Sequence, residues 1–315
     1  MKLLRSIESV PEALRGAVVS VGNFDGVHLG HQRIMRRLVE TAQRLGRPAL
    51  VFTFDPTPLE VLQPDDAPPR LCWTERKLEL LERLGVGAAI VLPTDRPFLD
   101  LAARQFFDDY LIARLAAAAV VEGYNFRFGR GRSGDVGLLA QWCAESSAPF
   151  ELVEPVDVEG EPVSSSRVRR AVAAGRVELA ARLLGRPHRI RGVVVRGAGR
   201  GAGLGFPTAN VARTDTLLPA EGIYAGLAHL AGAALPAAIS LGPNPTFDEQ
   251  RLKIEVYILD FDGDLYGQVL QVDFLARLRD IERFGSVERL VAAMRRDVES
   301  VRRVVAGGEA ACPAE

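Results

Sequence analysis

Cysteine is scarce in this sequence, and its scarcity argues against several classes of protein. The 315 residues include three cysteines, Cys72, Cys143 and Cys312, and no Cys-x-x-Cys pair. An odd number of widely spaced cysteines argues against a disulfide framework and against a cysteine-rich zinc module. It suits a reducing compartment, so we expect a cytoplasmic protein.

The sequence also lacks an excess of either charge. Its 39 Lys and Arg residues balance 40 Asp and Glu residues, giving a formal net charge of −1, and lysine occurs only at Lys2, Lys77 and Lys253. Without a large positive charge the chain has no general attraction for nucleic acid or for an anionic membrane. We expect small molecules as its partners, with no nucleic acid and no membrane among them. The sequence leaves open whether copies of the chain form a homo-oligomer.

Long hydrophobic runs are missing as well. The first residues, Met1 to Ser6, lack the apolar core of a signal peptide. The longest apolar stretch, Leu111 to Val121, contains Arg114 and is too short to cross a bilayer. These observations predict a soluble protein. With 315 residues and 48% hydrophobic content, the chain has the length and the apolar material for two domains.

Apolar runs and helical patterns alternate through the first part of the chain. Strands are predicted at residues 17–21, 48–54, 88–92, 119–122 and 150–156. Helices are predicted at residues 31–45, 74–84, 99–115 and 136–146, the second of them capped by Thr74. This alternation predicts a Rossmann-like α/β domain, with a parallel sheet covered by helices on both faces.

The pattern changes after about Gly185, where short β-rich runs follow one another. These runs are residues 190–196, 223–230, 236–241, 252–260 and 269–274. Glycine and proline separate them, and Asp262-Gly263 is typical of a hairpin turn. The spacing predicts a small antiparallel β-barrel, followed by a C-terminal helix at 287–305. We therefore predict two domains, residues 1–184 and 185–305, and a disordered tail at 306–315.

A turn between the first strand and the first helix has the composition of a phosphate site. It reads G-N-F-D-G-V-H-L-G-H, from Gly22 to His31. Glycines let the backbone approach a phosphate, and a helix N-terminus presents unpaired N–H groups to an anion. His28 and His31 could donate to the same phosphate oxygens, and they are two of only four histidines in the chain. The alternative is an ordinary connection whose histidines only cap and pack.

Three further segments place polar residues where they could join this turn. Asp55 ends the second strand in F-T-F-D-P, Asn125 and Arg127 follow a later strand in G-Y-N-F-R-F-G, and Ser164 opens a helix in S-S-S-R-V-R. The carboxyl ends of parallel strands share one edge of a sheet, so we expect a single site there. Each segment alone is weak evidence, and the serines by themselves are typical of a helix N-cap or a linker.

The second part of the chain has its own glycine-rich segment, from Gly192 to Asn210. It reads G-V-V-V-R-G-A-G-R-G-A-G-L-G-F-P-T-A-N. The spacing Gly197-x-Gly199-x-x-Ala202 imitates a dinucleotide-binding fingerprint. Phe206-Pro207-Thr208 cannot start the helix that such a fingerprint requires. The glycines alone are equally consistent with a flexible loop between strands.

These motifs resemble those of one known family. Residues 17–170 resemble the H-x-G-H nucleotidylyl transferases, and specifically the FMN adenylyltransferase half of the bacterial bifunctional riboflavin kinase/FAD synthetases. G-F-P-T-A-N, ending at Asn210, resembles the riboflavin kinase signature, and the resemblance extends to residue 305. It implies an enzyme that uses ATP twice, with Mg²⁺ as cofactor. Riboflavin would be phosphorylated to FMN in the second domain, and FMN would be adenylylated to FAD, with release of pyrophosphate, in the first.

The resemblance also implies roles for individual residues. In the first domain His28, His31 and Arg169 would stabilise charge on the reacting phosphates. The other nucleotide- and flavin-binding positions implied there are Gly22, Phe24, Asp25, Gly26, Asp55, Asn125, Arg127, Ser164, Ser165 and Ser166. In the second domain Thr208 and Asn210 would bind Mg²⁺ and phosphate. Glu255, in I-E-V-Y-I-L-D, would be the general base, and its alternative is a solvated strand glutamate. Gly203, Gly205 and Pro207 complete the second set.

The sequence departs from the family at three positions. Several members carry Asp where Asn125 stands, so a carboxylate at that position is not required here. Tyr257 stands where His is frequent, and Asn244, in G-P-N-P-T-F, stands where Arg is common. Two rival interpretations remain: a chain with one active site and a second domain kept as a scaffold, and a non-catalytic flavin-binding protein.

Overall fold

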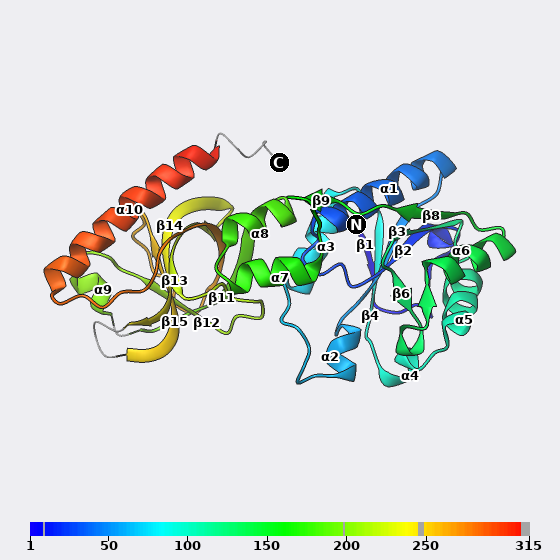
Figure 1. Ribbon diagram of the computed structural model, residues 1–315, viewed down its shortest axis with the longest axis horizontal. Helices are drawn as coiled ribbons and strands as arrows, with labels where there is room; N and C mark the ends of the chain where they lie inside the picture. Colours follow the sequence, from blue (N-terminus) through cyan, green and yellow to red (C-terminus); the bar gives the residue numbers. More distant parts are fainter. Residues whose placement is uncertain (9, 198, 245–248, 310–315) are drawn as a thin grey trace. The chain divides into compact units, whose positions relative to one another are not determined.

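The computed structural model describes the chain apart from residues 9, 198, 245–248 and 310–315. It divides into two compact units (Figure 1). Unit 1 consists of Met1–Pro68 and Trp73–Ser164, and unit 2 of Pro69–Cys72 and Ser165–Glu315. Each unit has a hydrophobic core of its own.

Unit 1 is built on a parallel sheet. Its strands are β1 (Lys2–Leu4), β2 (Val18–Val21), β3 (Ala49–Phe54), β4 (Ala88–Leu92), β5 (Ala119–Gly123) and β8 (Phe150–Val153). They lie in the order β1-β4-β3-β2-β5-β8, and every neighbouring pair is parallel. This confirms the predicted parallel sheet. The sequence does not reveal β1, because three residues are too few to show a period.

Helices cover both faces of this sheet, as predicted. They are α1 (Leu29–Leu45), α2 (Pro58–Leu62), α3 (Thr74–Arg83), α4 (Arg96–Leu99), α5 (Ala103–Phe106), the π-helix η2 (Phe107–Arg114) and α6 (Val136–Glu145). Successive strand residues face opposite cores: Val18 packs in a cluster with Leu38 of α1, and Val19 in a cluster with Leu111 of η2 and Leu139 of α6. The short elements are η1 (Glu12–Leu14), β6 (Arg127–Phe128), η3 (Arg130–Arg132), β7 (Gly134–Asp135), β9 (Asp157–Val158) and β10 (Glu161–Pro162).

The single helix predicted at 99–115 is wrong. Asp95 caps α4 by accepting a hydrogen bond from the Phe98 N–H at 2.9 Å, and the chain then breaks before α5 and η2. Phe106 and Phe107 are adjacent in sequence, yet both are buried in one core. From Phe107 to Arg114 the chain forms a π-helix in place of the expected α-helix.

The order of the strands reverses at β2. β3 lies on one side of β2 and β5 on the other, which makes this the topological switch point of the sheet. Pairing of β2 with β3 continues to Val21↔Phe52, but pairing of β2 with β5 ends at Val19↔Val120. β2 and β5 therefore separate at their carboxyl ends. Ligands of open α/β sheets bind in the crevice that such a separation creates.

Unit 2 contains a closed antiparallel barrel, which confirms the second predicted architecture. Its strands are β11 (His188–Val195), β12 (Ala209–Ala212), β13 (Gly222–Leu230), β14 (Ala233–Asn244), β15 (Glu249–Ile258) and β16 (Val269–Arg279), in the order β11-β12-β15-β14-β13-β16. β11 pairs with β16 and closes the barrel. The hairpin predicted at Asp262-Gly263 is wrong, because β15 and β16 are not neighbours and these residues lie in a longer loop.

Four helices accompany the barrel among the described residues of unit 2. They are α7 (Ser165–Ala173), α8 (Val177–Leu184), α9 (Arg200–Gly203) and α10 (Val287–Glu309). Val177 of α8 belongs to the barrel core, and Glu178 accepts a hydrogen bond from the Arg277 N–H at 2.9 Å. α7 and α8 thus belong to unit 2, although the predicted domain boundary falls after them, at 184/185. That boundary stays a prediction about which piece folds alone.

The end of α10 differs from the prediction. The helix was expected to stop at 305 and to be followed by a disordered tail, but it continues to Glu309. Residues 310–315 lie outside the described part of the chain. α10 lies along the barrel, where Val301 packs in a cluster with Ala225 and Leu259.

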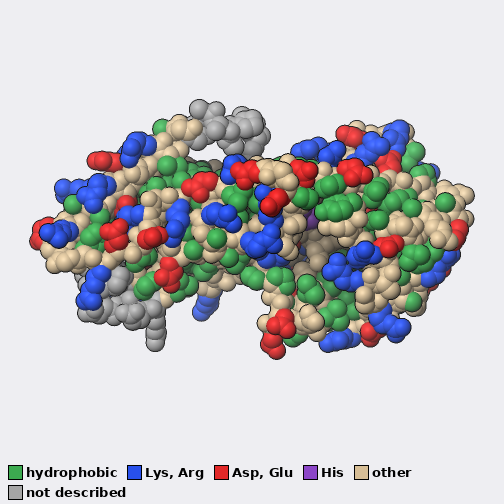
Figure 2. All heavy atoms as spheres, in the orientation of Figure 1, with side chains coloured by type: hydrophobic (Ala, Val, Ile, Leu, Met, Phe, Trp, Pro, Cys, Tyr) green, Lys and Arg blue, Asp and Glu red, His purple; other side chains and the backbone are tan. Residues whose placement is uncertain are grey.

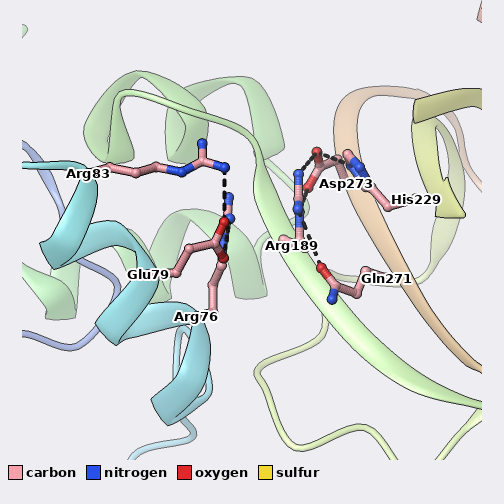
Figure 3. A network of polar contacts seen from close by, with 7 residues as sticks. All are labelled: Arg76, Glu79, Arg83, Arg189, His229, Gln271 and Asp273. Atoms are coloured by element: carbon pink, nitrogen blue, oxygen red, sulfur yellow. Dashed lines mark hydrogen bonds and ion pairs between the residues drawn. The ribbon is translucent and has the colours of Figure 1, made fainter. Parts of the chain in front are cut away.

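Charged side chains of both signs are interspersed on the face of the molecule in Figure 2, as the near-zero net charge leads one to expect. Some acidic groups are enclosed instead, and Asp273 is one of them. Asp273 of β16 is 4% exposed and accepts hydrogen bonds from Arg189 at 2.6 and 2.7 Å and from His229 at 2.8 Å (Figure 3). Among the residues that the structure describes, no helix has the length and apolar character needed to cross a membrane.

Candidate active sites

The first candidate site is the turn that joins β2 to α1. His28 is the N-cap of α1, and its Nδ1 accepts a hydrogen bond from the His31 N–H at 3.4 Å. The two imidazole rings are stacked, with centroids 3.6 Å apart. A side chain at Gly30 would place its Cβ 3.1 Å from the His28 ring, so glycine makes room for this arrangement. The structure brings the two histidines together at the N-terminus of a 17-residue helix, where an anion is stabilised.

The backbone of this turn is unusual. Phe24, Gly26 and Val27 have φ values of 46°, 78° and 41°, in the left-handed region. A β-branched residue such as Val27 is strained there, so the surrounding structure must hold the turn in place. The Phe24 ring contacts the His31 ring edge-on, with centroids 5.4 Å apart, and a Cβ at Gly22 would lie 3.0 Å from the Phe24 ring. Asp25, in the middle of the turn, is buried.

Two buried ionisable residues that were not predicted from sequence contact the backbone at the start of the turn. Lys77 of α3 donates to the Asn23 carbonyl oxygen at 3.1 Å. Glu122 of β5 accepts from the Val21 N–H at 2.5 Å. Complete burial raises the pKa of Glu122 well above its ordinary value, and the hydrogen bond from Val21 offsets this only in part. The available signals were a rare lysine in an amphipathic helix and a glutamate inside an apolar strand.

The strands on either side of β2 place two more predicted residues at the same edge of the sheet. Asp55 follows β3, and its carboxylate accepts a hydrogen bond from the Thr74 hydroxyl at 2.6 Å. Thr74 is therefore not the N-cap of α3 that the sequence suggested; Trp73 holds that position. Asn125 follows β5 and is exposed.

An ion pair joins the two strands of the hairpin after Asn125. Arg127 is exposed and donates to the Asp135 carboxylate at 3.0 Å, across the β6–β7 pair. The pKa of Asp135 is lowered chiefly because its carboxylate caps α6 by accepting from the Leu138 N–H, and Arg127 adds to the effect. Arg127 is thus partly engaged by its own hairpin.

The remaining residues predicted for the first site divide between the units. Ser164 ends the second segment of unit 1, whereas Ser165 and Ser166 begin α7 in unit 2. Arg169, also in α7, donates from Nε to the Pro69 carbonyl oxygen at 2.8 Å, within unit 2. Unit 1 by itself therefore assembles the turn, Asp55 and Asn125, but not Arg169 and the last two serines.

The second candidate site is a pocket at one side of the barrel. Three predicted residues line it together: Thr208, Asn210 and Glu255. Asn210 and Glu255 are paired directly across β12 and β15, so the sheet register sets their spacing. β12 (Ala209–Ala212) is missing from the strands expected from sequence because it begins within the P-T-A-N motif, directly after Pro207-Thr208.

The glycine-rich loop forms one wall of this pocket. Gly199 and Gly201 line it, and a Cβ at Gly197 would lie 2.2 Å from the Asn210 side chain, so only glycine fits at 197. The sequence predicts no helix after the fingerprint-like spacing, and the loop contains only the single turn α9 before Gly205, whose φ is 84°. Gly203 has open space around its Cβ position.

A second, apolar wall of the pocket was not predicted from sequence. Side chains from the barrel, the segment after β16 and α10 contribute to it: Ile223, Ile239, Ile281, Leu290, Met294 and Val298. The Arg279–Asp297 ion pair, with N···O distances of 3.0 and 2.8 Å, joins β16 to α10 at this wall. Such a wall suits a flat, largely apolar ring system.

A second hollow lies next to this pocket and shares Thr208 with it. Its lining includes Pro207, Phe261 and Tyr266. Tyr257, one of the departures from the family, lines the first pocket and contacts Phe206 edge-on. Another departure, Asn244, ends β14, but its side chain and residues 245–248 of the same motif lie outside the described part of the structure.

The described residues contain no group of three His, Cys, Asp or Glu side chains that could hold a metal ion alone. Thr208, Asn210 and Glu255 instead supply hydroxyl, amide and carboxylate oxygens to one pocket. A magnesium ion is bound by few protein oxygens and shares the rest of its ligands with substrate phosphates and water. The residues present therefore fit a magnesium–nucleotide complex.

Two family models match the chain. A FAD synthetase model matches residues 10–167, and a riboflavin kinase model matches residues 184–305. The first match covers the turn, Asp55 and Asn125. The second covers the barrel and α10 up to residue 305.

Curated relatives match the chain along nearly its whole length. The bifunctional riboflavin kinase/FMN adenylyltransferase of Escherichia coli (strain K12) is 37% identical over 304 residues, 96% of this chain and 97% of its own. The protein of the same name from Pseudomonas fluorescens is 38% identical over 307 residues, 97% and 98% of the two chains. A crystal structure from Streptococcus pneumoniae, described as a macrolide-efflux protein, matches with a TM-score of 0.86 and 32% identity over 95% of this chain and 98% of that one.

Proposed function

This chain belongs to the family of bifunctional riboflavin kinases/FMN adenylyltransferases, which make FAD from riboflavin by way of FMN, and we propose that each of its units carries one of the two reactions. Its substrates are riboflavin, FMN and ATP. Unit 1 would join the adenylyl group of ATP to FMN, and the barrel of unit 2 would phosphorylate riboflavin.

In unit 1 the reaction needs charge stabilisation and no general base. The phosphate of FMN is already an anion; its oxygen attacks the α-phosphorus of ATP, and pyrophosphate leaves. Stacked His28 and His31 at the N-terminus of α1 would donate to the phosphates as negative charge builds up. Gly22, Phe24, Asp25 and Gly26 would shape the turn around the nucleotide.

The other residues assigned to unit 1's reaction complete the binding of nucleotide and flavin. Asp55 and Asn125 lie at the carboxyl ends of the strands next to β2, and Arg127 follows Asn125. Ser164, Ser165, Ser166 and Arg169 remain assigned to this reaction by the resemblance of their motif alone.

In unit 2 the reaction needs a base. The 5′-hydroxyl of riboflavin is a poor nucleophile, and a carboxylate that takes its proton during attack on the γ-phosphorus of ATP makes it competent. Glu255 would be that base, and the apolar wall from Ile223 to Val298 would hold the isoalloxazine ring. The hollow lined by Pro207 and Tyr266 would take the nucleotide, with Thr208 between the two. Gly203 and Gly205 would belong to the loop over the phosphates.

We assign Mg²⁺ to Thr208 and Asn210 together with the nucleotide phosphates. When bound, the ion neutralises phosphate charge in the transition state. The protein's part is to hold Thr208 at the junction of the two hollows and Asn210 opposite Glu255 in the sheet.

One observation carries the proposal for unit 2: the strand register places Asn210 opposite Glu255, in a pocket that Thr208 also lines. An incubation with riboflavin, ATP and Mg²⁺, analysed for flavins by chromatography, tests the proposal as a whole. We expect FMN to appear first and FAD to follow. FMN without FAD would indicate a chain with one active site, and neither product would indicate a flavin-binding protein.

A further inference from the structure

The turn from Gly22 to His28 is anchored by side chains from both faces of the sheet. On the face of α1 and α3 the anchor is Lys77, which is 5% exposed and is one of three lysines in the sequence. On the opposite face it is Glu122, which is 1% exposed. The two anchors hold the backbone on either side of Gly22, at Asn23 and at Val21.

Lys77 links the turn to the end of β3. Its ammonium group donates to the Asn23 carbonyl oxygen and to the Thr53 hydroxyl, both at 3.1 Å, and to the Phe54 carbonyl oxygen at 3.5 Å. The Thr53 hydroxyl also donates to the Asn23 carbonyl oxygen, at 3.3 Å. Hydrogen bonds from a charged donor are about twice as strong as neutral ones. Lys77 therefore fixes the start of the turn against the neighbouring strand.

The Glu122 side chain takes the place of a backbone hydrogen bond that β2 and β5 do not form. Pairing of β2 with β5 ends at Val19↔Val120, so the N–H of Val21 has no ladder partner on β5. The Glu122 carboxyl group accepts from this N–H instead. Burial raises the pKa of Glu122, so its carboxyl group is held towards the neutral form, which keeps an oxygen acceptor. β2 and β5 can thus separate without leaving a buried N–H unsatisfied.

The two anchors have a consequence for His28 and His31. The turn that follows Asn23 holds Phe24 and Val27 in left-handed conformations, which the chain would otherwise leave. We propose that Lys77 and Glu122 are positioning residues for adenylyl transfer, which fix the turn carrying His28 and His31 without touching substrate. This rests on the proposed function of unit 1.

The test for Lys77 is Lys77→Met in the full-length enzyme, with Lys2→Met as the matched control at an exposed lysine. We expect the kcat for FAD formation from FMN and ATP to fall about 10²-fold in Lys77→Met, since a misplacement of about 1 Å has an effect of this size. The KM values should change much less, and riboflavin phosphorylation and the melting transition should persist. A folded Lys77→Met enzyme with near-normal kcat would overturn the proposal for Lys77. So would an effect on KM alone.

Two substitutions test Glu122. Glu122→Gln keeps an oxygen acceptor for the Val21 N–H and should retain most of the kcat. Glu122→Leu removes that acceptor and should lose kcat in the same way as Lys77→Met. The reverse order of the two variants would overturn the proposal for Glu122.

A double variant separates this inference from the proposed function. If Lys77 acts through the turn, His28→Ala and Lys77→Met combined should lose clearly less than the product of the two separate fold-changes. Independent, multiplicative effects would contradict the inference. If His28→Ala alone left FAD formation intact, the proposed function of unit 1 would fail; if only Lys77→Met were silent, the positioning role alone would fail.

Discussion

In the proposed function Glu255 is the general base, and the chemical difference between the two reactions then depends on this residue. Phosphorylation of riboflavin must deprotonate an alcohol, whereas adenylylation starts from an existing phosphate anion. The register that pairs Glu255 with Asn210 sets the carboxylate among the pocket residues rather than in bulk solvent.

Glu255→Gln should therefore separate the two activities. Gln keeps the size of the side chain but cannot accept a proton at neutral pH, so we expect kcat for riboflavin phosphorylation to fall ~10²–10⁴-fold. FAD formation from added FMN should stay normal. Initial rates with each flavin substrate measure both steps. Near-normal phosphorylation would make Glu255 an ordinary strand residue and leave the base to be sought elsewhere, for example at Asp260.

Glu122 should make the folded chain less stable as pH rises, whereas most carboxylates make a folded protein less stable as pH falls. Its pKa is raised in the folded chain by burial, so folding takes up a proton in the window above the ordinary Glu value of about 4.3. Stability of unit 1 should then fall as pH rises through this window, by up to about 1.4 kcal/mol per pH unit. Denaturant unfolding of wild type and Glu122→Gln between pH 5 and 8 measures this. Parallel pH profiles for the two proteins would show that Glu122 is ionised when folded.

At the scale of elements, the sequence predicts helices and strands that show a periodic apolar pattern. It misses elements that are too short or too local to show one. The β2–turn–α1 unit is predicted because apolar periodicity marks the strand and the helix, and glycines mark the turn between them. The positions of the two histidines are predicted with that turn. β1 is missed because three residues are too few to show a period, and β12 because it begins within the P-T-A-N motif, directly after Pro207-Thr208. The break between α4 and α5 is missed because no glycine or proline between Leu99 and Ala103 marks it.

The residues of the candidate sites divide in the same way, into those that the sequence predicts and those that it misses. Thr208, Asn210 and Glu255 belong to sequence motifs, so resemblance finds them. Lys77 and the apolar wall formed by Leu290 and Met294 belong to none. They reach their sites only through the packing of α3 on the sheet and of α10 on the barrel.

The helices before the barrel provide a prediction about which piece folds alone. Val177 of α8 is fully buried in the barrel core, and Glu178 accepts from the Arg277 N–H. Removing a buried valine side chain forfeits about 1.5–3 kcal/mol. A fragment of residues 165–315 should therefore be more stable, and a better riboflavin kinase, than one of residues 186–315. Urea melts and kinase assays of both decide this, and equal stability would mean that the barrel does not depend on α7 and α8.

At the scale of the whole molecule, we expect the stability of the barrel to fall in acid because of Asp273. Burial alone would raise the pKa of Asp273, but the hydrogen bonds from His229 and Arg189 outweigh it, so the pKa lies below its ordinary value. The stability contributed by this ionised group is present at neutral pH and is lost as pH falls below about 4.

Asp273→Asn should unfold more easily than wild type at pH 7, because it leaves the half-buried Arg189 without its anion, and its stability should depend less on pH in the acid range. Breaking a buried ion pair in this way destabilises a protein by about 3–5 kcal/mol. The matched control is Asp260→Asn, which breaks the exposed pair with Arg302 and should change little. Calorimetry of the three proteins at pH 3 to 7 provides the comparison. Equal losses in the two variants would show that burial does not strengthen the Asp273 cluster.

The central claim is that the two reactions belong to two separate sites. Mixing two variants, each lacking one of the two activities, tests it most directly. His28→Ala should convert riboflavin to FMN and stop, with FAD formation reduced ~10²–10³-fold. Glu255→Gln should make FAD only when FMN is supplied. A mixture of the two proteins with riboflavin, ATP and Mg²⁺ should restore FAD formation, because FMN released by the first serves as substrate for the second. Loss of FMN production in folded His28→Ala, or a mixture that makes no FAD while each protein retains its remaining step, would contradict the account.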